Sequence, residues 1–368
     1  MRCGFITTSR ADFGIYLPLI RAIEQEGWKY YVFAGGMHTS SKFGRTVVLI
    51  EKEYGIEVSE KIQSLVDDDS PSGIVQSMGA TVTNFGSLWS RYKDEVDVVF
   101  VLGDRFEMFS AAASLLPYNI PIAHLHGGES TLGAIDDKFR HAITAFSDFH
   151  FASTEQHAAR VAQIVGSAKK VYNVGALGID GINLAELYSP DEFSKLFGFN
   201  VREPYALVTY HPETVDLRNE EFVHELTGAL KQLPYKVLCT LPNADTQGSV
   251  IRNQLMMFEK EEPSKIRCFE NLGQRGYLSA MKYCQMMIGN TSSGIIEAAS
   301  FNKPVINVGN RQKGRTAGEN VLHVPNQTSA IVEAVEFVEK NLGGMQFRNP
   351  YGDGTAANKI IGILKKLF

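Results

Sequence analysis

The densest group of side chains that could exchange protons lies in one short stretch of the sequence. It combines histidines, carboxylates and an arginine, namely His124, His126, Glu129, Asp136, Asp137, Arg140 and His141. A stretch this rich in ionisable groups is hard to explain by packing. Carboxylates and histidines whose pKa values are set by their surroundings serve as general acids and bases. The stretch therefore predicts proton-transfer chemistry.

Structural interpretations of the same residues stay open. His124 and His126 share one face of a strand expected over residues 120–126, so one or both could be core histidines with satisfied hydrogen bonds. Asp136 and Arg140 are four residues apart, as are Asp137 and His141. Either pair could simply stabilise a helix. The stretch lacks a metal-ligand spacing such as HExxH, so we expect no metal site.

Two charged turns follow other expected strands. In the turn Thr8–Gly14, Arg10 could pair with a phosphate; the alternative is a capped surface turn with Asp12 as the N-cap. The turn is not a GxGxxG dinucleotide fingerprint. Asp104 and Arg105 could form an ion pair or cap the next helix, but their place at the carboxyl end of a strand equally predicts a role in a site.

The second half of the sequence carries groups suited to binding an anion. His211 follows an expected strand and precedes Pro212, which biases it towards an extended conformation. The turn Asn290–Gly294 joins a strand to a helix, and consecutive N–H groups with hydroxyls in such a turn bind anions. Glu297 could accept hydrogen bonds from both hydroxyls of a ribose. Arg311 opens a basic stretch that either adds cations or is a solvated loop. Together these groups predict a site for a nucleoside diphosphate.

Short apolar runs alternate with amphipathic stretches, the pattern of parallel strands joined by crossover helices. The strands expected in the first half span residues 3–7, 30–34, 96–102, 120–126 and 149–152. Those expected in the second half span residues 205–210, 236–241, 266–269, 286–288 and 305–308. Ligands of open α/β sheets bind outside the carboxyl ends of the strands. We therefore expect two Rossmann-like, doubly wound α/β domains, over residues 1–177 and 178–355, whose functional groups face each other across a cleft.

Composition and charge argue against several classes of function. The chain has 368 residues, of which 44% are hydrophobic and 21% charged, as in globular proteins of two domains. Its net charge of -5 offers no basic field to a nucleic acid, so we expect no such partner. The N-terminal apolar run is too short for a signal peptide, no run is long enough to span a membrane, and the four cysteines are dispersed. We expect a cytoplasmic protein that does not bind membranes.

A series of short motifs runs along the chain in a fixed order: Ser9-Arg10-Ala11-Asp12, Gly36-Met37-His38, Gly103-Asp104-Arg105, His126-Gly127-Gly128-Glu129, Ile135-Asp136-Asp137, Arg140-His141, His211-Pro212-Glu213-Thr214, Gly289-Asn290-Thr291-Ser292-Ser293-Gly294 and Asn310-Arg311-Gln312-Lys313-Gly314-Arg315. In this the sequence resembles the hydrolysing UDP-N-acetylglucosamine 2-epimerases of sialic-acid synthesis, over essentially the whole chain. The resemblance implies a GT-B-like pair of domains with the active site in the interdomain cleft and the C-terminal helix, residues 356–368, packed on the first domain. It also implies no metal and no cofactor.

The resemblance further implies a reaction and a role for each motif. The family removes the proton on carbon 2 of UDP-N-acetylglucosamine, eliminates UDP to leave a glycal, and adds water to give N-acetylmannosamine. By position, the acid/base set is Asp104, Glu129 and Asp137, with support from His38, His126 and Asp136. The residues matching the UDP contacts are Arg10, Arg105, His211, Asn243, Thr291, Ser292, Glu297 and Arg311. Relatives of this kind lead us to expect a homodimer or homotetramer whose small-molecule partner is a UDP-sugar.

Two positions depart from the family, and rival functions stay open. His126 stands where the animal enzyme has Glu, as it does in the bacterial capsule type, and Thr291 stands where Ser is commoner. One rival is a relative that acts on UDP-2,4-diacetamido-2,4,6-trideoxyglucose, on the way to legionaminic acid. A non-hydrolysing epimerase is disfavoured, because His124–Gly128 replaces its usual His-Val-Glu-Ala-Gly. A GT-B glycosyltransferase would have less use for the clustered carboxylates, and a sugar-nucleotide sensor would need none of them.

Overall fold

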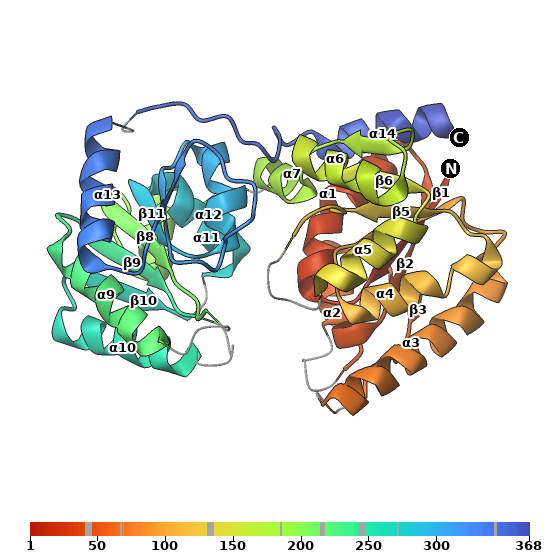
Figure 1. The fold of residues 1–368 in the computed structure, drawn as a ribbon, viewed down its shortest axis with the longest axis horizontal. Helices are drawn as coiled ribbons and strands as arrows, with labels where there is room; N and C mark the ends of the chain where they lie inside the picture. Colours follow the sequence, from red (N-terminus) through yellow and green to blue (C-terminus); the bar gives the residue numbers. More distant parts are fainter. Residues whose placement is uncertain are drawn as a thin grey trace. The chain divides into compact units, whose positions relative to one another are not determined.

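The computed structural model describes residues 1–40, 46–66, 68, 70–130, 136–184, 186–213, 218–242, 248–270, 272–341 and 344–368, with the backbone alone at 10, 11, 49, 183 and 184. These residues form two compact units (Figure 1). The first unit comprises Met1–Leu184 and Tyr351–Phe368, and the second comprises Ala185–Pro350.

The first unit is built on a seven-stranded parallel sheet in the order β3-β2-β1-β4-β5-β6-β7. Its strands are β1 (Arg2–Thr7), β2 (Lys29–Ala34), β3 (Glu60–Lys61), β4 (Val98–Leu102), β5 (Ile122–Leu125), β6 (Phe149–Ala152) and β7 (Val171–Asn173). Its helices are α1 (Arg10–Gln25), α2 (Val47–Tyr54), α3 (Pro71–Tyr92), α4 (Phe106–Ala113), α5 (Asp136–Phe146), α6 (Glu155–Val165), α7 (Leu177–Leu184) and α14 (Ala356–Leu367), with short 3₁₀ helices at Gly36–His38 and Leu116–Tyr118.

The second unit is built on a six-stranded parallel sheet in the order β10-β9-β8-β11-β12-β13. Its strands are β8 (Tyr205–Thr209), β9 (Lys236–Thr240), β10 (Ile266–Phe269), β11 (Met286–Gly289), β12 (Val305–Val308) and β13 (Val321–Val324). Its helices are α8 (Pro190–Phe197), α9 (Asn219–Gln232), α10 (Gly248–Glu261), α11 (Gly273–Tyr283), α12 (Ser292–Ile296) and α13 (Thr328–Asn341), with a 3₁₀ helix at Ala298–Phe301.

Both sheets are covered by helices on both faces. Successive strand residues point to opposite faces, so Phe5 joins a core with α1 and α14, whereas Ile6 joins a second core with α3 and α4. In the second unit, Val208 packs with α9, α10 and α13, and Leu207 packs with α8 and α11. This arrangement confirms the prediction of two doubly wound α/β units.

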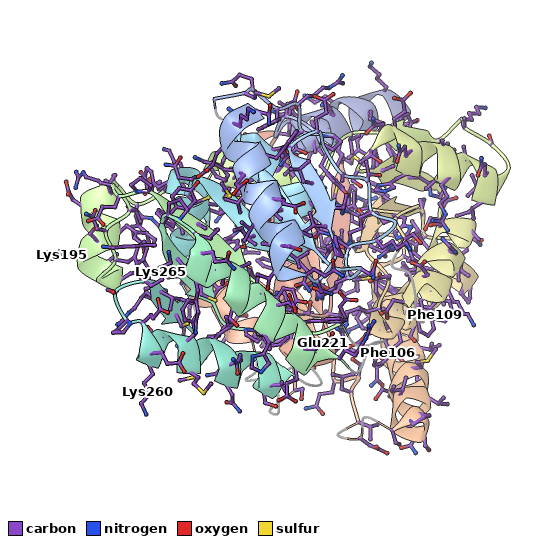
Figure 2. The ribbon with its side chains drawn as sticks, turned by 60° about the vertical axis from the view of Figure 1, so that its left-hand side comes forward. Phe106, Phe109, Lys195, Glu221, Lys260 and Lys265 are labelled. Carbon is purple, nitrogen blue, oxygen red and sulfur yellow. The ribbon has the colours of Figure 1, made fainter. Side chains whose placement is uncertain are left out.

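In the helices of the second unit, regularly spaced apolar residues form one face, and this face packs on the sheet. In α8 and α10, the buried Phe193 and Phe258 lie on the face that meets the core. Lys195 and Lys260 lie on the other face and extend away from the ribbon (Figure 2). Each helix therefore keeps its charged side chains in water while its apolar stripe is buried.

Three strands were not anticipated from the sequence. They are β3 and β7 in the first sheet and β13 in the second. Each is an edge strand of two to four residues, and residues on all three are partly exposed. Edge strands of this kind are short and half solvated, so they lack the continuous apolar run that marks a central parallel strand.

The first unit extends past the expected boundary near residue 177, because α7 packs against α1 and α14. The carboxylate of Asp180, on α7, accepts hydrogen bonds from the backbone N–H groups of Ala356 at 3.0 Å and Ala357 at 2.7 Å. These are the first residues of α14, and the side chain of its N-cap Thr355 does not cap the helix, because its hydroxyl bonds to Asp353 instead. Asp180 therefore caps a helix that lies far away in the sequence.

No helix within the described part of the chain is long and apolar enough to cross a membrane.

We expect Asp180→Ala to lower the free energy of unfolding by about 1–2 kcal/mol, because two N–H groups at a helix start lose their acceptor. Urea denaturation measures the loss. The control is Glu203→Ala, which removes an exposed ion pair with Lys236 and should cost less than about 1 kcal/mol. Equal losses in the two variants would contradict the capping role.

Candidate active site

Polar side chains gather at the carboxyl ends of β1, β4 and β5, where the turns carry unusual backbone conformations. Gly128 has a φ of 80°, and a Cβ at this position would lie 2.3 Å from the carbonyl oxygen of His157. Only glycine can occupy such a place. His126 has a φ of 61°, which is uncommon for a residue with a side chain. The turn after β5 is therefore held in a conformation that its neighbours impose.

The two histidines of this segment have different environments. His124, on β5, is fully buried, and its ring nitrogens bond to Thr144 Oγ1 at 3.2 Å and to the carbonyl oxygen of Gly103 at 3.1 Å. Burial lowers its pKa to about 3, so His124 is a neutral core histidine. Because β5 ends at Leu125, His126 does not continue the alternation, and the expectation that both histidines share a face is wrong.

His126 and Glu129 form a hydrogen-bonded pair, with 2.8 Å between Nδ1 and Oε1. The same carboxylate oxygen accepts a hydrogen bond from Ser153 Oγ at 2.9 Å, and Ser153 in turn bonds to His157 Nδ1 at 2.9 Å. Burial alone would raise the pKa of Glu129, but the hydrogen bond and charge of His126, with the charge of Arg140, hold it well below its usual range. An ionised carboxylate only accepts hydrogen bonds, so His126 donates from Nδ1 and its Nε2 is the nitrogen left for a proton transfer.

A buried arginine joins the remaining carboxylates. Arg140 forms an ion pair with Asp104, which follows β4, and its NH1 lies 3.7 Å from Asp137 Oδ1. Asp137 also accepts a hydrogen bond from Ser130 Oγ at 2.8 Å. Burial raises the pKa of Asp136, and the charge of Asp104 raises it further. The bonds of Arg140 thus go to Asp104 and Asp137, and not to Asp136 four residues earlier, so it joins β4 to α5 as well as bracing its own helix.

His38 lies apart from these carboxylates. It is fully buried, and its two ring nitrogens bond to Thr7 Oγ1 and Thr46 Oγ1, both at 2.9 Å. Burial lowers the pKa of His38. Since both nitrogens are occupied, His38 ties the end of β1 to the start of α2 and has no ring nitrogen left for a substrate.

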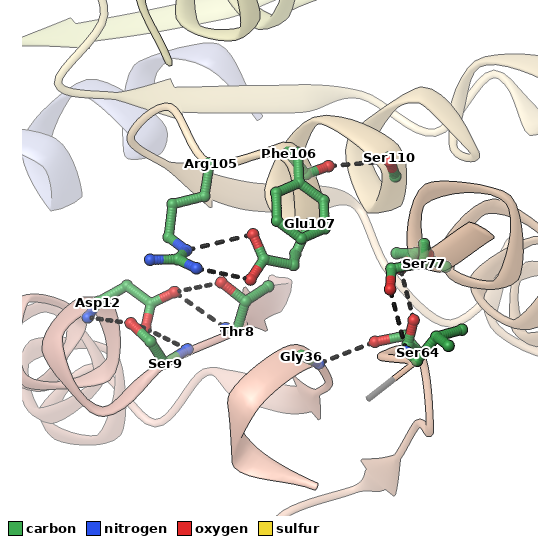
Figure 3. Close-up of polar contacts among 12 residues, drawn as sticks. Thr8, Ser9, Asp12, Gly36, Ser64, Ser77, Arg105, Phe106, Glu107 and Ser110 are labelled. Carbon is green, nitrogen blue, oxygen red and sulfur yellow. Dashed lines mark hydrogen bonds and ion pairs between the residues drawn. The ribbon is translucent and has the colours of Figure 1, made fainter. Parts of the chain in front are cut away.

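The turn between β1 and α1 is built around a buried carboxylate. Asp12 accepts hydrogen bonds from the backbone N–H and the hydroxyl of Thr8, both at 2.9 Å, and from those of Ser9, both at 2.8 Å (Figure 3). Ser9 is the N-cap of α1 and forms a capping box with Asp12. The alternative of a surface turn with Asp12 as the N-cap is therefore wrong. The side chain of Arg10 lies outside the described residues.

In the second unit, Asn290 organises the expected diphosphate site. Its side chain accepts a hydrogen bond from the His211 N–H at 2.7 Å and donates one to the His211 carbonyl at 2.8 Å. Its carbonyl oxygen accepts bonds from Arg311 NH1 at 3.1 Å and Gln312 Nε2 at 2.8 Å. Gly289, with a φ of 140°, is required beside it, because a Cβ would lie 2.0 Å from the carbonyl oxygen of Thr209.

The turn that leads into α12 presents hydroxyl groups. Thr291 is the N-cap of α12, and its Oγ1 lies 3.1 Å from Ser293 Oγ, which bonds to the hydroxyl of Tyr277 at 2.7 Å. Ser292 is the first residue of the helix. Burial raises the pKa of Glu297 to about 7, and its carboxylate has no hydrogen-bond partner within the described residues. Asn243 lies outside the described residues.

The structure thus brings most of the expected residues into two groups, one in each unit, and adds several that sequence reasoning missed. Ser153, His157 and Tyr277 support the expected residues without having been singled out, and Asn290, noted only as part of the anion-binding turn, joins His211 to Arg311. Ser153 directly follows a strand, the criterion that found the others, but a lone serine carries no charge to draw notice. No group of three His, Cys, Asp or Glu side chains that could hold a metal ion occurs in the described ranges.

Comparisons with known proteins agree on one family. A family model described as UDP-N-acetylglucosamine 2-epimerase matches residues 21–365. The chain is 35% identical to the GDP/UDP-N,N'-diacetylbacillosamine 2-epimerase (hydrolyzing) of Campylobacter jejuni, over 91% of this chain and 86% of that protein. It is 33% identical to polysialic acid biosynthesis protein P7 of Escherichia coli, over 98% of this chain and 93% of the relative.

The fold is similar to that of a solved structure, the UDP-GlcNAc 2-epimerase from Neisseria meningitidis bound to UDP-GlcNAc. The TM-score is 0.81, at 16% sequence identity, and both chains are covered completely. At this identity the likeness concerns the fold alone, and it agrees with the GT-B-like architecture implied by the motifs.

We expect Glu297→Gln to stabilise the protein at pH 8 by on the order of 2 kcal/mol and to change it little at pH 4. A carboxyl whose pKa is raised in the folded state binds its proton more tightly there than in the unfolded state. Its contribution to the free energy of unfolding is therefore present at low pH. That contribution is lost as the pH rises from the unfolded value, about 4.3, to about 7. Urea denaturation at the two pH values measures the difference, and an equal effect at both would contradict the burial of Glu297 as a charged group.

Proposed function

The chain belongs to the UDP-N-acetylglucosamine 2-epimerase family and is a nucleotide-sugar 2-epimerase of the hydrolysing type, and we propose that it converts UDP-N-acetylglucosamine and water into N-acetylmannosamine and UDP. One observation carries the proposal. The carboxylates of Asp104, Glu129 and Asp137 share the influence of Arg140 at the carboxyl edge of the first sheet. Elimination followed by hydration needs such a set of acids and bases.

The reaction would run in two stages. In the first, a base removes the proton from carbon 2, and the bond between carbon 1 and the phosphate oxygen breaks, so that the electron pair leaves with UDP. In the second, the oxygen of water bonds to carbon 1 of the glycal, and a proton is delivered to carbon 2 on the opposite face. Both stages need one group that accepts a proton and another that donates one.

The carboxylates of the first unit are suited to opposite roles. The pKa of Glu129 is lowered, and that of Asp136 is raised. Environments that push two pKa values apart produce a base and an acid in the same site. We assign the protonated role to Asp136 and the ionised role to Glu129, which holds the ring of His126 through Nδ1. Asp104 would hold Arg140 in place and assist the leaving group.

The second unit would bind UDP. His211 and Arg311, both held by Asn290, present cationic or N–H groups, and the hydroxyls of Thr291 and Ser292 lie in the turn before α12. Glu297 would accept the ribose hydroxyls, since its carboxylate lacks a partner in the described chain. Arg10 and Asn243 stay in the proposal on the family resemblance alone, as do assembly into a homodimer or homotetramer and a place in the cytoplasm.

A second substrate has a specific observation in its favour. The relative from Campylobacter jejuni carries the name of an N,N'-diacetylbacillosamine 2-epimerase. The two substrates share the UDP moiety and the acetamido group at carbon 2, and differ at carbons 4 and 6 of the sugar. The acid/base group of the first unit would serve either one.

Proton NMR of the protein in deuterated water, with each UDP-sugar in turn, tests the proposal. Free N-acetylmannosamine with deuterium at carbon 2, appearing together with UDP, is the expected result. Faster turnover of UDP-2,4-diacetamido-2,4,6-trideoxyglucose would make that sugar the substrate and leave the proposed hydrolysing epimerisation unchanged. Turnover of neither sugar would contradict the hydrolysing epimerase.

We expect Asp104→Asn and Glu129→Gln each to lower kcat by about 100-fold to 10,000-fold, the range of general acid–base catalysis. The affinity for UDP, measured by calorimetry, should stay near that of the unmodified protein, because the expected UDP contacts of the second unit are intact. Asp191→Asn, an exposed carboxylate paired with Arg202, is the control and should keep full activity. Full activity in both site variants would refute the roles given to these carboxylates.

A further inference from the structure

Glu107 is a buried carboxylate that the proposed reaction does not use. Its side chain is only 1% exposed. Oε1 accepts a hydrogen bond from Arg105 NH2 at 2.8 Å, and Oε2 accepts one from Arg105 Nε at 3.2 Å (Figure 3). The residue stands in the first turn of α4, where the helix dipole favours a negative charge. Both oxygens are therefore committed to one guanidinium.

This ion pair is buried on one side and open on the other. The side chain of Arg105 is 46% exposed, in contrast to that of Glu107. Taking a carboxylate out of water costs several kcal/mol, and a buried pair recovers this only when its geometry is good and its remaining groups are satisfied. A neutral side chain at position 107 would avoid this desolvation cost. The asymmetry points to a use for the exposed edge of the guanidinium.

The geometry of arginine defines that edge. A guanidinium carries five N–H groups in a planar fork. The side-on pair with Glu107 uses the Nε–H and one N–H of NH2. The end of the fork, with an N–H from NH1 and the second N–H of NH2, is not used by this pair. Two parallel N–H groups match two oxygens of a phosphate. Glu107 fixes the plane of the fork and hence the direction in which this end points.

The surrounding charges keep Arg105 available for an anion. Burial lowers the pKa of Arg105, but the carboxylates of Glu107, Asp12 and Asp136 outweigh it and raise that pKa. Asp12 does not compete for the guanidinium through hydrogen bonds, since its oxygens already accept those of Thr8 and Ser9. Arg105 is thus charged and oriented by one carboxylate, and within the described residues no other side chain bonds to the end of its guanidinium.

We propose that Glu107 is a positioning residue for nucleotide-sugar binding, which locks the side-on edge of Arg105 so that the end of the guanidinium meets phosphate oxygens of the substrate. The inference rests on the proposed function, because that function assigns Arg105 to UDP. Glu107 itself would touch no substrate atom. Its whole effect would pass through Arg105.

A double-mutant cycle with Glu107→Gln and Arg105→Ala tests this, with the affinity for UDP measured by calorimetry. We expect Glu107→Gln to weaken UDP binding by about tenfold, the loss expected when one guanidinium must be ordered on binding. In the Arg105→Ala background, the same substitution should change the affinity by less than about twofold, since coupled residues are not additive. A merely structural role would weaken binding equally in both backgrounds, and this result would overturn the proposal.

Two further variants keep the test decisive. Arg105→Lys keeps the positive charge, but an ammonium group cannot bond to Glu107 side-on and to a phosphate end-on at the same time. We expect it to lose about as much UDP affinity as Glu107→Gln. This variant also tests the proposal if Glu107→Gln folds poorly. Asp97→Asn weakens the arginine–carboxylate pair with Arg2 at the other end of the sheet and should leave UDP affinity unchanged. UDP affinity at the unmodified level in Glu107→Gln and Arg105→Lys would overturn the inference alone. Failure of the unmodified protein to bind UDP would instead overturn the proposed function.

Discussion

One buried guanidinium, that of Arg140, allows three carboxylates to occupy the same end of the first sheet. It pairs with Asp104, lies near Asp137, and contributes to the low pKa of Glu129. Carboxylates gathered at one end of a sheet repel one another, and a cation between them offsets that repulsion. An arginine suits the place because it stays charged at any pH that a protein experiences. The arrangement of the carboxylates therefore depends on a residue that transfers no proton itself.

The fold and many of the site positions could be predicted because both follow from the ends of parallel strands. Asp104, Glu129, His211 and Thr291 all come shortly after a buried apolar run, and the structure places each of them in such a turn. The edge strands β3, β7 and β13 could not be predicted in the same way, whereas the edge strand β10 could. These three strands are two to four residues long and partly exposed, so none of them carries the fully buried apolar run of a central parallel strand.

What the sequence could not show is how each side chain is occupied. His38 carries the residue type of a catalytic group, but hydroxyls hold both of its ring nitrogens. His126 and His124 look equivalent in an alternating strand, yet the left-handed backbone at His126 separates them. Asn290 carries no charge to attract notice, and only the three-dimensional structure reveals that it joins His211 to Arg311. These differences arise from contacts between distant segments, which residue spacing does not encode.

The path of the chain has a consequence for the order in which the protein acquires its structure. The first unit needs Tyr351–Phe368, whereas the second is continuous from Ala185 to Pro350. During synthesis, the apolar face of α1 that meets α14 must wait, uncovered, until the second unit has been made. Contacts between segments so far apart in sequence form slowly, and exposed apolar surface favours aggregation in the meantime. A nascent chain of this protein therefore has a long interval in which a chaperone can bind α1 before α14 packs on it.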